Sequence, residues 1–200
     1  SVDMLVVVAL GNPGRKYEAT RHNAGYLLAD ALSTHCRIGL KQTSCHAVYG
    51  RGRWRGCDLV IAKPTTYMNL SGLAVLELLR SFNCSPEHLM VACDDASLPL
   101  GQIRLRKSGS SGGQKGLQSI IDQLGTGEFS RLRLGIGPQP ERMPLEDYVL
   151  EEFTGEEMPV VEEMILRARD AVLCCMEKGI AAAMGRYNQR LSPPEEMKSS

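Results

Sequence analysis

Short apolar stretches alternate with segments of helical periodicity along almost the whole chain. Residues 4–10, MLVVVAL, and residues 89–93, LMVAC, are continuous apolar runs of strand length, which predicts buried strands. Residues 103–107 alternate apolar with basic side chains, which predicts a strand with one face in water. The full set of predicted strands is residues 4–10, 47–50, 58–63, 89–93, 103–107 and 131–136, with a turn over residues 51–56.

Helical periodicity separates these strands. Leucine, valine and phenylalanine recur about every 3.6 residues from Leu73 to Phe82, and residues 158–178 carry a long amphipathic pattern. The predicted helices are residues 24–35, 73–82, 117–124, 158–178 and 180–191, and residues 148–150 are expected to end a loop. We therefore expect one three-layer α/β/α domain over residues 1–191, with a mixed twisted sheet, followed by a disordered tail at residues 192–200.

Composition supports one globular domain and gives no global sign of a charged partner. The 200 residues are 43% hydrophobic, which is enough for one sizeable core. Lys and Arg number 23, and Asp and Glu also number 23, so the formal net charge is zero. A nucleic-acid partner would therefore have to be recognised by a local cluster of charge. No apolar run reaches the length of a membrane helix, so we expect no membrane partner. We also expect a monomer.

The seven cysteines favour thiols in a reducing compartment. Their number is odd, no CxxC pair occurs, and no Cys/His spacing is typical of a zinc site. We therefore expect neither a disulfide framework nor a metal site. No signal peptide is visible, and the chain begins at Ser1 rather than Met. A cytoplasmic protein and a mitochondrial protein whose upstream targeting segment has been removed are both compatible with this sequence.

Polar residues gather where two predicted strands end. Asn12 follows the first strand in an Asn-Pro-Gly turn, His22 lies just before a predicted helix, and Asp94 follows residues 89–93. Ligands of open α/β sheets bind beyond the carboxyl ends of strands, so we expect these three side chains to meet. An Asp that accepts from one ring nitrogen of a His allows the other nitrogen to deprotonate a water. A turn, a polar helix start and a capping acid are the structural alternatives.

The other candidate groups are an amide and a basic strip. Asn69, beside the apolar Met68, could cap a helix or donate its amide N–H to a carbonyl or an oxyanion. A Gly/Ser-rich loop, SGSSGGQKG, lacks the P-loop pattern but lies between two basic strands. Such charges usually form a solvated face, but their clustering in a neutral chain indicates a phosphate-bearing ligand. The basic residues are Arg104, Arg106, Lys107, Arg131 and Arg133.

Five stretches of the sequence, in this order and spacing, resemble one family. They are GNPGRKYEATRHNAG, PTTYMNLSG, DDASLPLG, GGQKGLQSI and FSRLRLGIG. Together they are similar to the bacterial-type peptidyl-tRNA hydrolases, and the resemblance covers about residues 5–187. It implies a single α/β domain that hydrolyses the ester between a peptide and the 3′ end of tRNA, releasing the tRNA for reuse without a cofactor.

The resemblance also implies roles for individual residues. The catalytic positions of the family match Asn12, His22 and Asp94. The positions that shape the pocket for the peptide and the acceptor end of the tRNA match Tyr17, Met68 and Asn69. The positions that clamp the tRNA 5′ phosphate match Arg106 and Arg133.

The sequence departs from the family in one loop. The family usually reads GGHNG where this chain has Gly112-Gly113-Gln114-Lys115-Gly116. We expect Gln114 and Lys115 to face the substrate. The ammonium of Lys115 could contact a phosphate or the ester carbonyl, or weaken the basicity of His22 by charge repulsion. Some relatives of this fold bind RNA in RNA processing or ribosome assembly without hydrolysis, and that is the alternative function. The complete set Asn12, His22, Asn69 and Asp94 favours the enzyme.

Overall fold

A mixed seven-stranded sheet forms the middle layer of the computed structural model, which describes residues 3–189. The strands follow the order β2-β3-β4-β1-β5-β7-β6. The central strands β4, β1, β5 and β7 are mutually parallel, whereas β2, β3 and β6 extend the sheet in antiparallel pairs. The bounds are β1 Met4–Ala9, β2 Gln42–Ser44, β3 Ala47–Trp54, β4 Cys57–Pro64, β5 Leu89–Pro99, β6 Ile103–Arg106 and β7 Ser130–Gly137.

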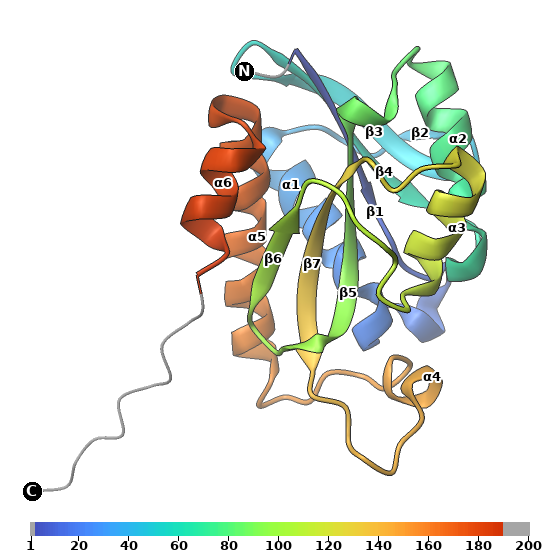
Figure 1. Cartoon of the computed structure of the whole chain (residues 1–200), viewed down its shortest axis with the longest axis vertical. Helices are drawn as coiled ribbons and strands as arrows, with labels where there is room; N and C mark the ends of the chain where they lie inside the picture. Colours follow the sequence, from blue (N-terminus) through green and yellow to red (C-terminus); the bar gives the residue numbers. More distant parts are fainter. Residues whose placement is uncertain (1–2, 190–200) are drawn as a thin grey trace, which may run out of the picture.

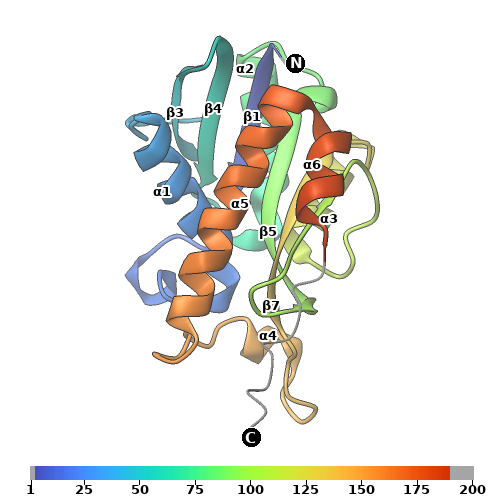
Figure 2. The same ribbon diagram turned by 90° about the vertical axis from the view of Figure 1, so that its left-hand side faces the viewer.

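Helices cover both faces of this sheet. One face carries α1 (Ala24–Cys36), α5 (Met158–Lys178) and α6 (Ile180–Tyr187), and α5 crosses the sheet diagonally in Figure 2. The other face carries α2 (Ser71–Ser81) and α3 (Lys115–Leu124), seen on the right of Figure 1. The short helix α4 (Leu145–Tyr148) lies beyond the edge of the sheet. The fold is therefore the expected α/β class with helices on both sides of a mixed sheet.

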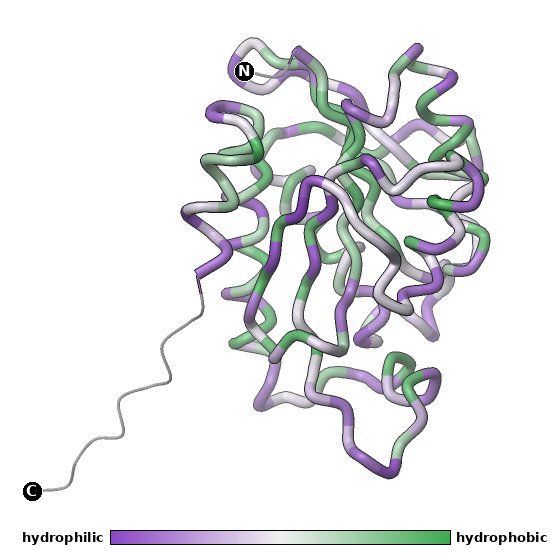
Figure 3. The backbone as a smooth tube through the Cα atoms, viewed as in Figure 1, coloured by the Kyte–Doolittle hydropathy of each residue, from purple (hydrophilic) through white to green (hydrophobic). Residues whose placement is uncertain are grey.

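The central strands read as continuous apolar runs because both of their faces are buried. Val7 and Ala9 of β1 pack into the core beneath α1 and α5, whereas Val6 and Val8 pack into the core beneath α2 and α3. The tube in Figure 3 is accordingly green along the central strands and purple over many of the surrounding loops. Strand side chains alternate between faces, so each central strand contributes to both cores.

The sequence located most elements but misjudged several boundaries. The strands β3 and β4 run through most of the predicted turn at 51–56, so the hairpin closes tightly between Trp54 and Cys57. The loop expected to end at residues 148–150 contains α4 instead, and β2 was not predicted. The last helix ends at Tyr187, two residues before the end of the described chain. The tail predicted at residues 192–200 lies outside the described residues.

The carboxyl ends of the parallel strands define one edge of the sheet, at the bottom of Figure 1. Short 3-10 helices lie in the loops at this edge. The loop after β1 contains η1 (Arg15–Tyr17) and η2 (Arg21–Asn23), and the loop after β4 contains η3 (Met68–Leu70). This edge therefore gathers η1, η2, η3 and α4, and the candidate site lies among them. Within residues 3–189, no helix has the length and apolar character needed to cross a membrane.

Candidate active site

His22 and Asp94 form a buried pair at the carboxyl edge of the sheet. His22 Nδ1 lies 2.8 Å from Asp94 Oδ2, and the residues are 8% and 3% exposed. A carboxylate can only accept, so Nδ1 carries the proton and Nε2 is left as the basic nitrogen. The backbone N–H of His22 donates to the carbonyl of Val149 at 2.8 Å, which fixes the main chain behind the ring. The expected pairing of His22 with Asp94 is confirmed by this geometry.

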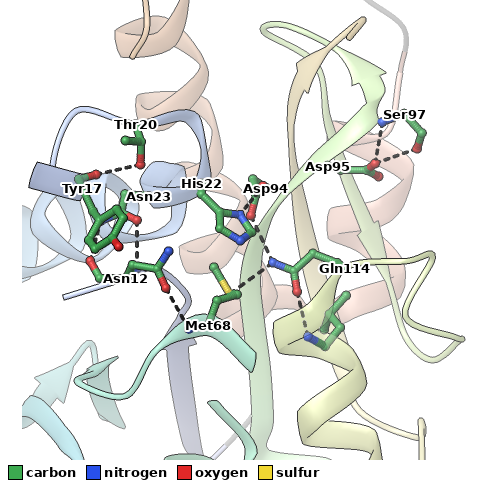
Figure 4. Close-up of polar contacts among 11 residues, drawn as sticks. Asn12, Tyr17, Thr20, His22, Asn23, Met68, Asp94, Asp95, Ser97 and Gln114 are labelled. Atoms are coloured by element: carbon green, nitrogen blue, oxygen red, sulfur yellow. Dashed lines mark hydrogen bonds and ion pairs between the residues drawn. The ribbon is translucent and has the colours of Figure 1, made fainter. Parts of the chain in front are cut away.

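Asp94 lies inside β5 rather than directly after a strand. The last residue of β5 that pairs with β1 is Ala92, opposite Ala9, so β5 projects beyond its neighbour before Asp94. Its side chain therefore emerges where β1 has ended and the chain has turned toward η2. The alternation of the strand turns Asp95 away, toward Ser97, as Figure 4 shows.

Asn12 is clamped between η2 and η3. Its backbone N–H donates to Asn23 Oδ1 at 2.9 Å, and Asn23 Nδ2 donates back to its carbonyl at 2.9 Å. Its side-chain Oδ1 accepts the backbone N–H of Met68 at 2.8 Å. The turn therefore presents the Asn12 amide to the site in one orientation. Asn23 is fully buried and holds this turn, a role that sequence reasoning did not assign.

Gln114 joins the site through the start of α3. As the N-cap residue, its Oε1 accepts the backbone N–H of Leu117 at 2.8 Å. Its Nε2 donates to Asp94 Oδ1 at 3.1 Å and lies 3.3 Å from Met68 Sδ. Figure 4 shows Gln114, Met68, Asp94 and His22 side by side at one end of the site. The residue expected to face the substrate thus also donates to Asp94, the partner of His22.

These side chains line one cavity of about 630 Å³. Every predicted site residue lines it except Tyr17 and Arg106. Asn69 is exposed there, and its side chain makes no hydrogen bond to another residue of the described chain. Tyr17 is half-buried on η1, where its carbonyl accepts the Thr20 hydroxyl at 2.7 Å. The predicted residues that line the cavity are Asn12, His22, Met68, Asn69, Asp94, Gln114, Lys115 and Arg133.

The basic residues of β6 and β7 share one face of the sheet but differ in exposure. Arg104 lies opposite Arg133 and Arg106 opposite Arg131, while the apolar residues between them point toward α5. Arg104 and Arg106 are exposed, and neither has an ion-pair partner within residues 3–189. The side chain of Arg133 is only 16% exposed, lies 3.5 Å from an Asp95 carboxylate oxygen, and donates to the Ser110 carbonyl at 3.1 Å.

The expectation that Arg131 belongs to an exposed strip is wrong. Its side chain is fully buried and donates to the carbonyls of Gly109, Ser110, Gly127 and Phe129. Burial, followed by the charge of Arg133, lowers the pKa of Arg131. The guanidinium joins the loop before α3 to the loop after it, because two carbonyls from each loop accept its hydrogen bonds. The alternating pattern could not separate this buried arginine from its exposed neighbours.

The remaining wall comes from the segment after β7, which sequence reasoning had assigned no function. Leu145, Val149 and Leu150 line the cavity together with Tyr67 and Met68. Arg21 holds this segment in place, because its guanidinium stacks on Tyr148 and bonds both carboxylate oxygens of Glu157 at 2.9 Å. In the sequence, Arg21 directly precedes the candidate base His22, which could have indicated a role at the site. Nothing in the pattern identified Glu157 as the partner of Arg21.

Five of the seven cysteines are buried. Cys93 directly precedes Asp94 but is fully buried, and burial raises the pKa of its thiol. Burial also raises the pKa of Cys175 to about 12. These buried thiols are poor nucleophiles at neutral pH. Among residues 3–189, His, Cys, Asp and Glu side chains form no group of three or more arranged to hold a metal ion.

The chain is similar to known proteins in both sequence and fold. The sequence model of the family described as peptidyl-tRNA hydrolase matches residues 6–195. A peptidyl-tRNA hydrolase of Thermotoga petrophila is 45% identical over 184 residues, covering 92% of this chain and 97% of that protein. One of Bacillus subtilis is 42% identical over 188 residues, covering 94% and 100%. The crystal structure of peptidyl-tRNA hydrolase from Acinetobacter baumannii has a TM-score of 0.88 at 32% identity, covering 94% and 96%.

Proposed function

This chain belongs to the peptidyl-tRNA hydrolase family, and from that membership we propose how its own residues cleave the ester of peptidyl-tRNA. The reaction is the hydrolysis of peptidyl-tRNA. The observation that carries the mechanism is the 2.8 Å contact between His22 Nδ1 and Asp94 Oδ2 at the wall of the cavity. His22 is the general base and Asp94 is the group that orients it.

The base acts through Nε2. Asp94 accepts a hydrogen bond from Nδ1–H, so Nε2 has a free lone pair for a water in the cavity. As the water oxygen attacks the ester carbonyl, its proton passes to Nε2, and the positive charge on the ring is stabilised by the Asp94 carboxylate. When the tetrahedral intermediate collapses, the 3′ oxygen of the tRNA leaves and takes a proton from the imidazolium. The products are the free peptide acid and the free tRNA.

Amides position the water and the carbonyl. Asn12 Oδ1 is occupied by the backbone N–H of Met68, so its Nδ2 is the end that donates toward the substrate. Asn69 lines the same cavity with an amide that makes no hydrogen bond to another described residue. A preorganised N–H donor stabilises the negative charge that develops on the carbonyl oxygen. We assign the water to Asn12 and the carbonyl oxygen to Asn69.

The substrate lies across the cavity and the basic face. The apolar side chains of Met68, Val149 and Leu150 line the part that receives the peptide. The tRNA acceptor end lies toward β6 and β7, where Arg106 and Arg133 take the 5′ phosphate through charge-assisted hydrogen bonds. Arg106 is the more accessible of the two, whereas Arg133 has to share its charge between the phosphate and Asp95. The protein acts as a monomer in a reducing compartment.

The decisive experiment uses N-acetylaminoacyl-tRNA labelled in its acyl group. Purified protein should release the N-acetylamino acid, and His22→Ala should abolish most of that release while still binding the tRNA. Binding of tRNA or ribosomal RNA without acyl release by the wild type would replace the enzyme with an RNA-binding factor. Full activity in His22→Ala would keep the enzyme but remove His22 as its base.

A further inference from the structure

We propose that Gln114 is a positioning residue of the hydrolase, which locks the Asp94 carboxylate so that His22 keeps the Nδ1–H tautomer. The proposal rests on the proposed roles of His22 and Asp94. It concerns a residue that departs from the usual GGHNG sequence of the family. Each oxygen of Asp94 has its own donor, since Oδ2 faces His22 Nδ1 at 2.8 Å and Oδ1 accepts from Gln114 Nε2 at 3.1 Å.

The orientation of the Gln114 amide is determined by chemistry. The backbone N–H of Leu117 can only donate, so the side-chain atom 2.8 Å from it must be the oxygen. The NH₂ group is therefore the end that faces Asp94 and the sulfur of Met68. One side chain thus caps α3 and donates to the catalytic carboxylate at the same time.

The backbone around Gln114 fixes its position. Its N–H donates to the Ser111 carbonyl at 3.1 Å, and its carbonyl accepts from Gln118 at 3.0 Å. Gly116 allows α3 to approach the site, because a Cβ there would lie 2.6 Å from Met68 Sδ and 3.0 Å from Gln114 Oε1. Because hydrogen bonds fix both its backbone and its side chain, Gln114 can keep the Asp94 carboxylate in one orientation.

The expected consequence is loss of orientation when the donor is removed. With Oδ1 unoccupied, the Asp94 carboxylate can rotate about its terminal torsion, and the hydrogen bond to His22 loses its alignment. Without the hydrogen bond from Gln114, the negative charge of the Asp94 carboxylate also stabilises the protonated imidazolium more strongly. Other charged groups that line the cavity are Lys115, Glu146 and the Arg133–Asp95 pair, and they remain unchanged by this substitution.

Gln114→Ser separates the two roles of Gln114. Serine is a good N-cap, so the start of α3 is retained, but its hydroxyl is too short to reach Asp94. We expect a melting temperature close to that of the wild type, a fall in kcat of roughly 10-fold with little change in KM, and a higher pH for half-maximal rate. Gln118→Ser is the matched control, because Gln118 is an exposed residue of the same helix that bonds Asp122.

Gln114→Glu tests the sign of the effect. It keeps the shape and an oxygen that can cap α3, but replaces the donor to Asp94 with a second carboxylate. Repulsion between the two carboxylates is relieved when the site takes up a proton, so the pH of half-maximal rate should rise further than in Gln114→Ser. An unchanged kcat and pH profile in both variants would overturn the proposal.

A readout without turnover distinguishes this proposal from the proposed function. The ¹⁵N chemical shifts of the His22 ring report its tautomer in the free protein. The wild type should show the Nδ1–H form, and Gln114→Ser should show a mixture of both forms. The same spectrum in both proteins would reject Gln114 as a positioning residue even if His22→Ala is inactive. Absence of acyl release by the wild type would instead reject the catalytic function and leave the tautomer test valid.

Discussion

The backbone N–H of Met68 donates to Asn12 Oδ1 at 2.8 Å, which determines which end of the Asn12 amide is available to the substrate. Because an N–H cannot accept, the oxygen must face Met68 and the NH₂ group must face away from it. Asn12 thus connects η3 to the turn after β1 and still has a donor to offer. Asn12 supports a loop and, in the proposed mechanism, also donates toward the substrate. A test of its role therefore requires a substitution that removes the donor and keeps the support of the loop.

Asn12→Asp separates the two roles of Asn12. An aspartate keeps an oxygen for the N–H of Met68 but loses the NH₂ donor and adds a negative charge near the Asp94 carboxylate. We expect kcat to fall about 10²-fold, because the attacking water loses the donor that positions it, with little change in melting temperature. Steady-state kinetics of acyl release measure it. Wild-type kcat in a folded Asn12→Asp protein would show that the amide only supports the loop.

Substitutions in the His22–Asp94 pair should abolish turnover without abolishing tRNA binding. His22→Ala should lower kcat by roughly 10²–10⁴-fold, the contribution of a general base. Asp94→Asn should also lower kcat strongly, because its amide can hold the ring in the wrong tautomer. Filter binding of tRNA should remain near the wild-type level in both variants. A loss of binding as large as the loss of rate would indicate that the pair holds substrate rather than activating water.

The contact between His22 and Asp94 could be predicted from the sequence because strand topology brings distant residues together. His22 and Asp94 are 72 positions apart, but each follows an apolar run that could be recognised as a buried parallel strand. Parallel strands place their carboxyl ends at one edge, so the pairing followed from recognising the strands. The same reasoning placed Asn12 at that edge. The family resemblance added Tyr17 and the assignment of Arg106 and Arg133 to the tRNA 5′ phosphate, which periodicity alone could not supply.

The sequence could not predict which polar side chains are held by other protein groups. Arg131 and Arg133 occupy equivalent places in an alternating strand, yet one is buried among four carbonyls and the other pairs with Asp95. Loop conformation decides this, and Gly/Ser-rich loops have weak local preferences. Likewise the contact between Arg21 and Glu157 joins residues 136 positions apart, with no periodic signal. Long-range side-chain pairs are therefore the least predictable part of the site.

Arg106→Ala should weaken tRNA binding and make it less sensitive to salt. Arg106 is exposed and has no ion-pair partner within the described chain, so its charge is available for a phosphate. Removal of one phosphate contact should lower the slope of log K against log salt by about one. Arg80→Ala is the matched control, since Arg80 is exposed in the last turn of α2, which leads away from the site. Equal affinities and slopes for the two variants would make Arg106 part of a solvated face.

Lys115→Asn should change the rate without changing the fold. Lys115 is the first residue of α3, exposed, and lines the cavity that contains His22. Removing its ammonium removes a positive charge that opposes protonation of the ring, so the base becomes stronger. We expect a modest increase in kcat at pH 8 and a higher pH for half-maximal rate, with both effects reduced in high salt. An unaltered pH profile at low salt would place the ammonium in solvent without influence on His22.

Glu157→Gln should destabilise the protein at neutral pH and remove part of its acid sensitivity. The hydrogen bonds from Arg21 lower the pKa of Glu157. Burial opposes the charged form of Arg21, but its hydrogen bonds to Glu157 and the nearby charges of Tyr148, Glu157 and Glu151 together raise its pKa. A carboxyl whose pKa is lowered by folding contributes stability above its unfolded pKa, and this contribution is lost as the pH falls through the folded pKa. The wild type should therefore lose stability as the pH falls below about 4.5, the ordinary pKa of a glutamate side chain.

The variant should lack that part of the pH dependence because it has no proton to bind at this position. At pH 7 the free energy of unfolding should fall by about 1.5–3 kcal/mol, the range for hydrogen bonds to charged groups. Urea unfolding at pH 7 and at pH 3.5 measures both effects. Glu156→Gln is the control, since Glu156 is exposed one residue earlier in the chain. Equal losses for Glu156→Gln and Glu157→Gln at pH 7 would mean that the Arg21–Glu157 pair does not anchor the segment that closes the site.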